Sequence, residues 1–375
     1  FGAQQKASRS VGEPSGEGNL RGSREGFAEI LQLNMALIRR RVRSEKLRIE
    51  TMTIGSESKT DIAIFYMHGM ADAQMVSQTK KRLSEIKLSV IFDAGYLAPY
   101  IKRGNLSLFS GMGYTERPDT LAAKICEGKI GILVDGSPFA LLVPYLFTEN
   151  FHSMDDYTTY PFFASFVRLL KYVAFFMSIL LPGFFVSAVN YTPHIVPVEV
   201  LFGIMQNAQK TPLPLFAEAL LVIFILEIIR EAGLRMPKPL GHSLALLAAL
   251  IVGDAAVQTG LITSVSLVVL ALTSISTFTV PALYEATTVL RILFVLAGGF
   301  FGPVGMVLGV ALLLFNLTAV NVYDIPYTAP LTPLSEGAFD DGILRASLKK
   351  IEKNKFILRN FLNTEHSKNR REDED

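Results

Sequence analysis

The stretch that decides the fold class runs from Val289 to Val320 and reads VLRILFVLAGGFFGPVGMVLGVALLLFNLTAV. Arg291 is its only ionisable residue. A membrane-spanning helix needs about 20 apolar residues, so this run is too long for a single span. Its centre, GGFFGP at 298–303, combines glycine and proline, the residues that most often interrupt regular structure. The run therefore predicts two membrane helices joined by a turn.

Four further apolar runs precede this stretch: Tyr172–Tyr191, Leu213–Ile229, Leu240–Val257 and Leu261–Pro281. Each is of the length that crosses a hydrocarbon core of about 30 Å. Pro182 interrupts the first run, and a membrane helix tolerates such a proline when neighbours satisfy the carbonyl that it frees. Val198–Met205 is too short to span and suits an interfacial or re-entrant turn. The sequence thus predicts about five or six transmembrane helices.

Composition separates this apolar part from two charged parts. Only 19% of the 375 residues are charged, where a soluble protein carries about a quarter, and the mean hydropathy is +0.35. Charged residues gather near both ends of the chain. We therefore predict a linker at 1–23, a cytoplasmic α/β domain at 24–157, a transmembrane helical domain at 158–322, and a cytoplasmic charged tail with an amphipathic helix at 323–375.

Positive charge in short loops predicts the orientation in the membrane. Arg230, Arg235 and the segment that carries Arg291 fall on the same side as residues 1–171. The opposite loops, 192–212 and 258–260, contain a single lysine or arginine, which is Lys210. We expect a multi-pass protein with both termini in the cytoplasm.

The first charged part alternates between strand and helix patterns. Leu47–Thr53 and Asp61–Met67 are rich in β-branched and aromatic residues, and Asp135-Gly136 is a hairpin signal. Phosphate-loop, dinucleotide, zinc-protease and nucleophile-elbow motifs do not occur. The single cysteine, Cys126, excludes a disulfide framework and a Cys-based zinc site. We expect no enzymatic activity and no cofactor, and a net charge of +2 gives no basis for nucleic-acid binding.

A basic cluster closes the first predicted helix of this part, and it consists of Arg39, Arg40, Arg41 and Arg43. Such a cluster can bind lipid phosphates or an acidic partner. It is equally typical of a solvated helix end, because cations are favourable at the C-terminus of a helix.

Ionisable and hydroxyl side chains within the apolar runs are the candidate site residues, because charge in lipid is costly. Glu218 and Asp254 are candidates for an ion path or for polar contacts between helices. Thr273, Ser276 and Thr277 could line a hydrated path, or bond back to their own helix. Two spacings place opposite charges on one helix face and predict structural ion pairs: Glu227 with Arg230, and Glu231 with Arg235.

Several motifs resemble the A subunit of GerA-family spore germination receptors. The segments VGEP (11–14), LRGSREGF (20–27) and LIRRR (37–41) are similar to the family's EP…RGPREGF…LIRRRI pattern, with Ser23 where proline is usual. TERPD (115–119) and VDGSPF (134–139) resemble TERPD and VDGTPF. REAGLRMP (230–237), GDAAV (253–257) and IPY (325–327) resemble REAGIRLP, GQAAV and VPY, with Asp254 in place of glutamine. The matches appear in order and cover roughly residues 10–333.

This resemblance implies a subunit of a complex in the spore inner membrane that responds to nutrient germinants. In that family the A subunit works with a transporter-like B subunit and a lipoprotein C subunit. A subunits are thought to oligomerise around a cation-conducting pore. The alternative is a non-conducting signalling or assembly scaffold for another channel. The family's A subunit also has an upstream soluble subdomain, so we expect that a portion preceding Phe1 is missing.

Overall fold

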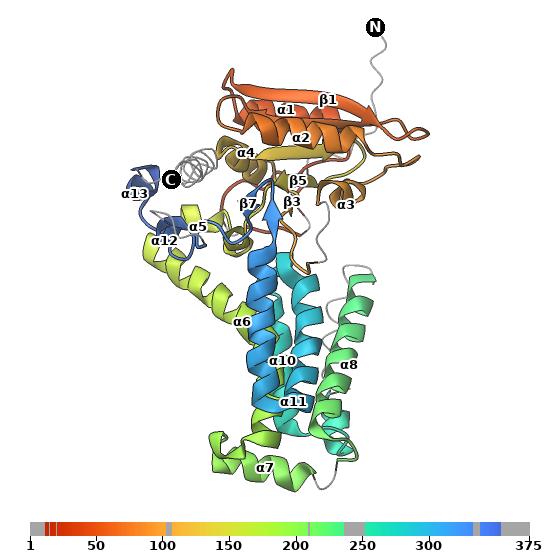
Figure 1. Ribbon diagram of the computed structural model, residues 1–375, viewed down its shortest axis with the longest axis vertical. Coiled ribbons are helices and arrows are strands. Elements are labelled where there is room, and N and C mark those ends of the chain that lie inside the picture. The colour runs from red at the N-terminus through yellow and green to blue at the C-terminus, as the bar shows by residue number, and fades with distance from the viewer. Residues whose placement is uncertain are drawn as a thin grey trace, which may run out of the picture. The chain divides into compact units, whose positions relative to one another are not determined.

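The structure is a computed structural model, and it describes residues 12–14, 16–19, 21–102, 107–208, 211–235, 251, 253–332 and 338–353. The side chains of residues 200, 205–208, 338, 352 and 353 are outside this description. The chain divides into two compact units. Unit 1 combines residues 1–169 with 317–375, and unit 2 comprises residues 170–316 (Figure 1).

Unit 1 is built on a five-stranded antiparallel sheet with the order β1-β2-β4-β5-β3. Its strands are β1 (Leu47–Ile54), β2 (Thr60–Met67), β3 (Gly113–Thr115), β4 (Ile130–Val134) and β5 (Ala140–Val143). Every residue of β4 and β5 is buried. Gly136 turns the chain between these two strands with a φ of 89°, a value that glycine adopts without strain. The predicted α/β fold is therefore confirmed for this part of the chain.

Two helices supply the apolar residues that cover this sheet. α1 (Leu31–Arg41) and α4 (Pro118–Cys126) pack against each other and against β2. Their shared core contains Leu31, Ile38, Phe65, Leu121 and Ile125. The other helices of this region are α2 (Ala73–Ser84), which Asp72 caps by accepting the Met75 N–H at 2.9 Å, and the short α3 (Ala98–Ile101) and α5 (Asp155–Thr158).

A segment from beyond the membrane helices completes unit 1. β6 (Asn321–Val322) and β7 (Ile325–Pro326) form a hairpin whose two turn residues, Tyr323 and Asp324, have φ values of 53° and 62°. The turn is held in place by Tyr323, whose hydroxyl accepts a hydrogen bond from Thr79 of α2 at 2.7 Å. Tyr327 is buried among aromatic rings, and its carbonyl accepts the Phe147 N–H at 2.8 Å.

The amphipathic helix predicted in the tail is interrupted. The described residues contain two short helices, α12 (Ala338–Asp341) and α13 (Leu348–Lys353). Between them, backbone groups bond elsewhere: the N–H of Arg345 donates to the Ser165 hydroxyl at 2.9 Å. The remainder of the tail, 354–375, lies outside the described residues.

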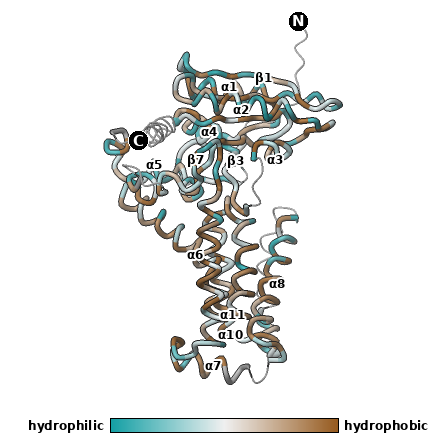
Figure 2. The backbone as a smooth tube through the Cα atoms, in the orientation of Figure 1, coloured by the Kyte–Doolittle hydropathy of each residue, from teal (hydrophilic) through white to brown (hydrophobic). Residues whose placement is uncertain are grey.

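Unit 2 is helical and mostly apolar (Figure 2). α6 (Pro161–Tyr191) begins in unit 1 and continues through unit 2. The later helices are α7 (Val198–Ala208), α8 (Leu215–Arg235), α10 (Ser264–Thr277) and α11 (Tyr284–Ala319), and residues 253–258 are also helical. Most of the predicted third span, Leu240–Val257, lies outside the described residues.

α11 is two helical arms joined at Gly302, which has a φ of 59° and a ψ of −142°. A Cβ built on Gly309 would lie 2.8 Å from Cε1 of Phe294, and one on Gly305 would collide with the Ala297 carbonyl. In a straight helix, fifteen residues would separate the first pair by about 22 Å. The chain therefore reverses direction at the centre of the 289–320 run, as its glycines and proline predict (Figure 1).

Among the described residues, two helical stretches are long and apolar enough to cross a membrane: Pro161–Tyr191 and Pro281–Ala319. The second includes the reversal at Gly302. α10 has only 14 residues, about 21 Å of helix, and α8 carries several charges along its length. The count of five or six spans stays a prediction.

Candidate functional site

Glu218 joins α8 to the beginning of α10. Its side chain is buried, and its Oε1 accepts the backbone N–H of Thr263 at 2.5 Å. Thr263 is the N-cap of α10, and its hydroxyl accepts the Ser266 N–H at 3.3 Å. A carboxylate that accepts an orphan N–H at a helix start is favourably placed. Glu218 thus makes a polar contact between α8 and α10.

Asp254 lies in a different setting. It is exposed, and its Oδ2 accepts a hydrogen bond from Nε2 of Gln258 at 2.7 Å, one turn along the same helix. No hydrogen bond or ion pair joins Asp254 to Glu218 in the part of the chain that the structure describes. The structure does not bring the two predicted acids together.

The three hydroxyl side chains of α10 bond to their own helix. Thr273, Ser276 and Thr277 are buried, and they donate to the carbonyls four residues earlier at 2.5, 2.8 and 3.1 Å. This geometry is the second of the two alternatives that the sequence leaves open. Each hydroxyl oxygen can still accept a further hydrogen bond.

Thr277 accepts such a bond from Arg291, the ionisable residue of the 289–320 run. Arg291 lies inside the first arm of α11 and is only 2% exposed. Its Nη2 donates to the Thr277 hydroxyl, and its Nε donates to the Ser178 carbonyl of α6 at 2.9 Å. Packing against α6 and α10 buries this guanidinium inside unit 2, and the side of the membrane predicted for its segment stays a prediction.

Glu227 is the centre of a contact between α8 and α11. Its carboxylate lies 3.1 Å from Nε of Arg230, and it accepts the hydroxyl of Tyr284. The Arg230 guanidinium also lies over the Tyr284 ring, 3.6 Å from the ring centroid. Thr288 adds a longer hydrogen bond of 3.4 Å. Tyr284 and Thr288 lie on α11, so the spacing along α8 that predicted the pair of Glu227 with Arg230 could not predict them.

Glu231 and Arg235 form an exposed pair at the end of α8, with 2.7 Å between Oε1 and Nη2. Exposed pairs of this kind contribute at most about 1 kcal/mol. The two side chains lie one turn apart on the exposed surface of α8.

The basic cluster at the end of α1 is partly neutralised within the chain. The Glu25 carboxylate lies 2.5 Å from both Arg40 and Arg41, and these guanidinium groups hold the pKa of Glu25 below its usual range. Arg43 donates to the Arg40 carbonyl at 3.4 Å. Arg39 and Arg43 are exposed, so only these two of the four predicted residues present charge without an ion pair among the described residues.

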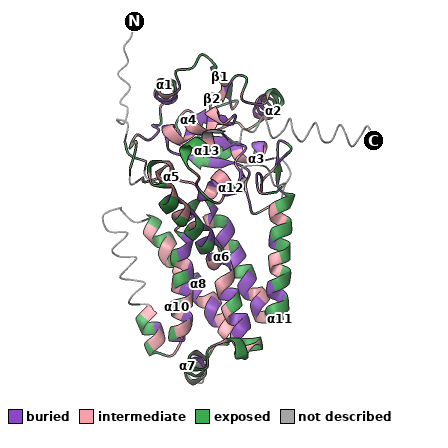
Figure 3. Ribbon diagram, turned by 90° about the vertical axis from the view of Figure 1, so that its left-hand side faces the viewer, coloured by how far each residue is buried: buried purple, intermediate pink, exposed green. Residues whose placement is uncertain are grey.

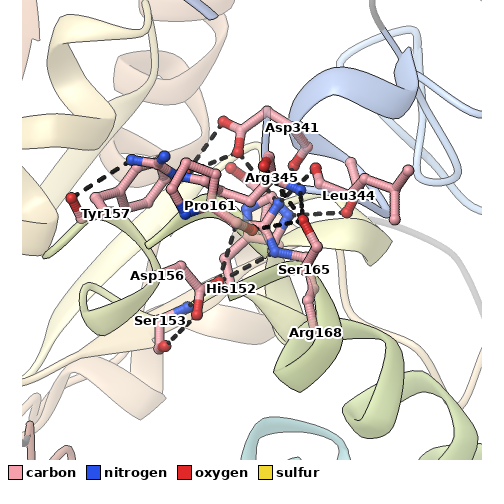
Figure 4. Close-up of polar contacts among 12 residues, drawn as sticks. His152, Ser153, Asp156, Tyr157, Pro161, Ser165, Arg168, Asp341, Leu344 and Arg345 are labelled. Carbon is pink, nitrogen blue, oxygen red and sulfur yellow. Dashed lines mark hydrogen bonds and ion pairs between the residues drawn. The ribbon is translucent and has the colours of Figure 1, made fainter. Parts of the chain in front are cut away.

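Sequence reasoning missed a second buried arginine, at the start of α6. Arg168 is fully buried; its Nε and Nη2 donate to Asp156 at 3.1 and 2.9 Å, and its Nη1 donates to the Asp341 carbonyl at 2.6 Å. Tyr157 donates to the Asp341 carboxylate at 3.0 Å. Figure 4 shows these side chains converging from α5, α6 and the C-terminal segment. We call this set of residues, Asp156, Tyr157, Arg168 and Asp341, the arginine clasp.

The family model described as Bacillus/Clostridium GerA spore germination protein matches residues 1–356. The chain belongs to this family.

Relatives within the GerA family resemble the chain along most of its length. Spore germination protein KA of Bacillus subtilis is 35% identical over 339 residues, which is 90% of this chain and 62% of that protein. The uncharacterised membrane protein YfkQ of Bacillus subtilis is 34% identical over 90% of this chain and 66% of its own length. The chain thus spans less than two thirds of either relative.

One solved structure also resembles part of this GerA-family chain. It is the crystal structure of the N-terminal domain of the A subunit of the Bacillus megaterium spore germinant receptor GerK3. The two are 38% identical over 32% of this chain and 97% of that one, with a TM-score of 0.27.

Proposed function

We propose that this GerA-family chain is the A-type membrane subunit of a spore germinant receptor, and that copies of it form a gated cation path that opens in response to nutrient germinants. The observation that carries the proposal is the polar interior of unit 2. Glu218, Glu227 and Arg291 sit in apolar helices and each bonds to a second helix. Charged groups at membrane depth are costly and are kept mainly where they serve transport or gating.

The proposal includes a multi-pass topology of five or six spans in the bacterial spore inner membrane, with both termini cytoplasmic. The second arm of α11 supports it. Val304, Val307, Leu308, Leu312 and Phe315 are all more than half exposed. Figure 3 shows exposed residues along α11 in green. Apolar surface of this extent needs lipid or another protein to cover it.

The proposed partners are further copies of the chain, a transporter-like B subunit, a lipoprotein C subunit and membrane lipid. Membership of the GerA spore germination family supports a role within a receptor of several subunits. Arg39 and Arg43 are the side chains of the basic cluster that would meet lipid phosphate. In this proposal the chain is not an enzyme and needs no cofactor.

The test is cation flux across liposomes that hold the chain, alone and with its B-type partner, with and without nutrients. Glu218→Gln keeps an oxygen that can accept the Thr263 N–H but removes the negative charge. We expect this variant to reduce flux while the protein level stays unchanged. Asp254→Asn is the parallel variant for an exposed acid. Absence of flux from a stable wild-type oligomer would refute the channel.

The second candidate function is a non-conducting scaffold that transmits the signal to another channel. The α10 hydroxyls favour it, since Thr273, Ser276 and Thr277 already donate to their own helix. Flux that requires a different subunit and persists when these three residues are replaced would support this candidate.

A further inference from the structure

Pro182 leaves an unpaired carbonyl in the middle of α6. In an α-helix the N–H of each residue donates to the carbonyl four residues earlier, so position 182 would normally serve Ser178. Proline has no N–H, and its ring pushes the carbonyl of that earlier residue aside. Ser178 is fully buried. Its carbonyl therefore needs a donor from outside the helix.

Arg291 is that donor. Its Nε lies 2.9 Å from the Ser178 carbonyl oxygen, although 113 residues separate the two in the chain. The same guanidinium donates through Nη2 to Thr277. One side chain on α11 thus closes the gap that Pro182 opens in α6 and ties both to α10.

Arg291 is held there without an acidic partner. Among the described residues, no carboxylate lies within ion-pair distance of its guanidinium. Its neutral acceptors in unit 2 are a helix carbonyl and a hydroxyl, and neither is as strong an acceptor as a carboxylate. This contact is therefore weaker than a buried ion pair and more easily broken.

The backbone next to Pro182 is packed as closely as two helices can be. A Cβ on Gly183 would collide with the Phe294 carbonyl, and a Cβ on Gly298 would collide with the Gly183 carbonyl. Further along, the Tyr191 hydroxyl donates to the Gly299 carbonyl at 2.9 Å. α6 and the first arm of α11 therefore run in the same direction in contact, and a change in the bend at Pro182 must move α6 against α11.

We propose that Arg291 is a positioning residue that fixes the bend of α6 at Pro182, and that its release from Ser178 is the step that lets α6 move during gating. The role of Arg291 in gating rests on the proposed function. Its role in fixing the bend of α6 concerns the fold alone, so the two roles can be tested separately.

A double-mutant cycle tests the contact. In Pro182→Ala the new N–H can donate to Ser178 within α6, so the helix no longer needs Arg291. We expect Arg291→Met to lower the thermal midpoint of the purified full-length chain in detergent by several degrees. The Pro182→Ala/Arg291→Met double variant should recover most of that loss. If Pro182→Ala gives no recovery, the assignment of Arg291 to the Pro182 gap is overturned.

The matched control is Arg230→Met, which removes an arginine whose ion pair and ring contact involve Glu227 and Tyr284 and not Ser178. Pro182→Ala should leave the loss caused by Arg230→Met unchanged. Should Arg291→Met not accumulate, Arg291→Lys serves the same comparison. A single ammonium group cannot reproduce the fork that reaches Ser178 and Thr277 together.

Flux through liposomes tests the gating half with the same variants. We expect Arg291→Met to raise cation flux in the absence of nutrient several-fold, and the double variant to return it to the wild-type level. If the wild-type chain conducts and Arg291→Met shows the same nutrient-free flux as the wild type, the contact is only structural and the gating step is refuted. A wild-type chain that never conducts refutes the proposed function instead, while the thermal cycle still decides the contact.

Discussion

The guanidinium Nη2 of Arg168 lies 2.9 Å from the Asp156 carboxylate, and both side chains are almost completely shielded from solvent, at 0% and 3% exposure. Breaking a buried pair of this kind leaves a charge without compensation and costs about 3–5 kcal/mol. We therefore expect Asp156→Ala to lower the free energy of unfolding of the full-length chain by about 3 kcal/mol or more. Denaturant titration in detergent measures it.

The exposed pair of α8 is the control for this prediction. Glu231→Ala removes a carboxylate that lies 2.7 Å from Arg235 on the surface, and we expect a loss of at most about 1 kcal/mol. Equal losses from the two variants would contradict the stabilising role of the arginine clasp.

His152 makes the stability of unit 1 depend on pH. Burial, and then the charges of Arg168 and Lys124, hold the pKa of His152 well below its usual range. Its Nε2 lies 3.2 Å from the Gly342 carbonyl, so the neutral ring carries its proton there, and Nδ1 has no partner among the described residues. Below the unfolded pKa of about 6.5, the unfolded chain binds a proton that the folded chain refuses. Stability is therefore full above that pH and falls as the pH drops below it.

The measurement is the thermal midpoint of the full-length chain between pH 7.5 and 5.5. We expect a decline in the wild type and a flatter profile in His152→Gln, whose amide can donate to Gly342 but cannot take up a proton. A profile that is the same in both proteins would exclude His152 as the cause.

The glycine contact between α6 and α11 predicts a steep effect from one methyl group. Gly298→Ala places a Cβ against the Gly183 carbonyl, and such overpacking costs about 1–3 kcal/mol. Gly203→Ala in α7 is the control, because it adds the same methyl group at a position where no atom lies within 4 Å of the new Cβ. We expect it to be neutral or to stabilise by less than about 1 kcal/mol. Thermal unfolding of the two variants in detergent checks the difference.

The reversal at Gly302 predicts a cross-link that a straight helix forbids. In a Cys126→Ser background, Phe294→Cys with Gly309→Cys should be joined by a short bifunctional thiol reagent, and peptide mass spectrometry should find the linked pair. Each single-cysteine variant should give only the singly modified peptide. Recovery of two separate modified thiols from the double variant would mean that the two arms do not pack together.

Sequence patterns predicted the local features of this fold well. Gly302 and Pro303 marked the reversal within one apolar run, and Asp135-Gly136 marked the β4–β5 turn. Each of these depends on a few neighbouring residues, and backbone chemistry there is nearly independent of the rest of the chain. The helix spacing of Glu227 and Arg230 belongs to the same class.

The features that sequence missed depend on residues far apart in the chain. Arg168 and Asp341 are 173 positions apart, and no local pattern relates them. The contacts of Arg291 were not predicted, because the residues around it in the chain do not indicate which distant groups it meets. One signal could have placed it correctly: Pro182 requires a donor for Ser178, and Arg291 is the ionisable donor of the 289–320 run.

The β6–β7 hairpin has a consequence for how the protein is made. Tyr323 packs beneath α2, and Tyr327 fills the aromatic cluster of Phe109 and Phe147. A ribosome adds these tyrosines only after it has synthesised all of residues 170–316. Until then Phe109 and Phe147 lack the ring that covers them. Unit 1, although most of its sequence comes first, is therefore among the last parts of the nascent chain to finish folding, and during synthesis its apolar surface stays open to chaperones.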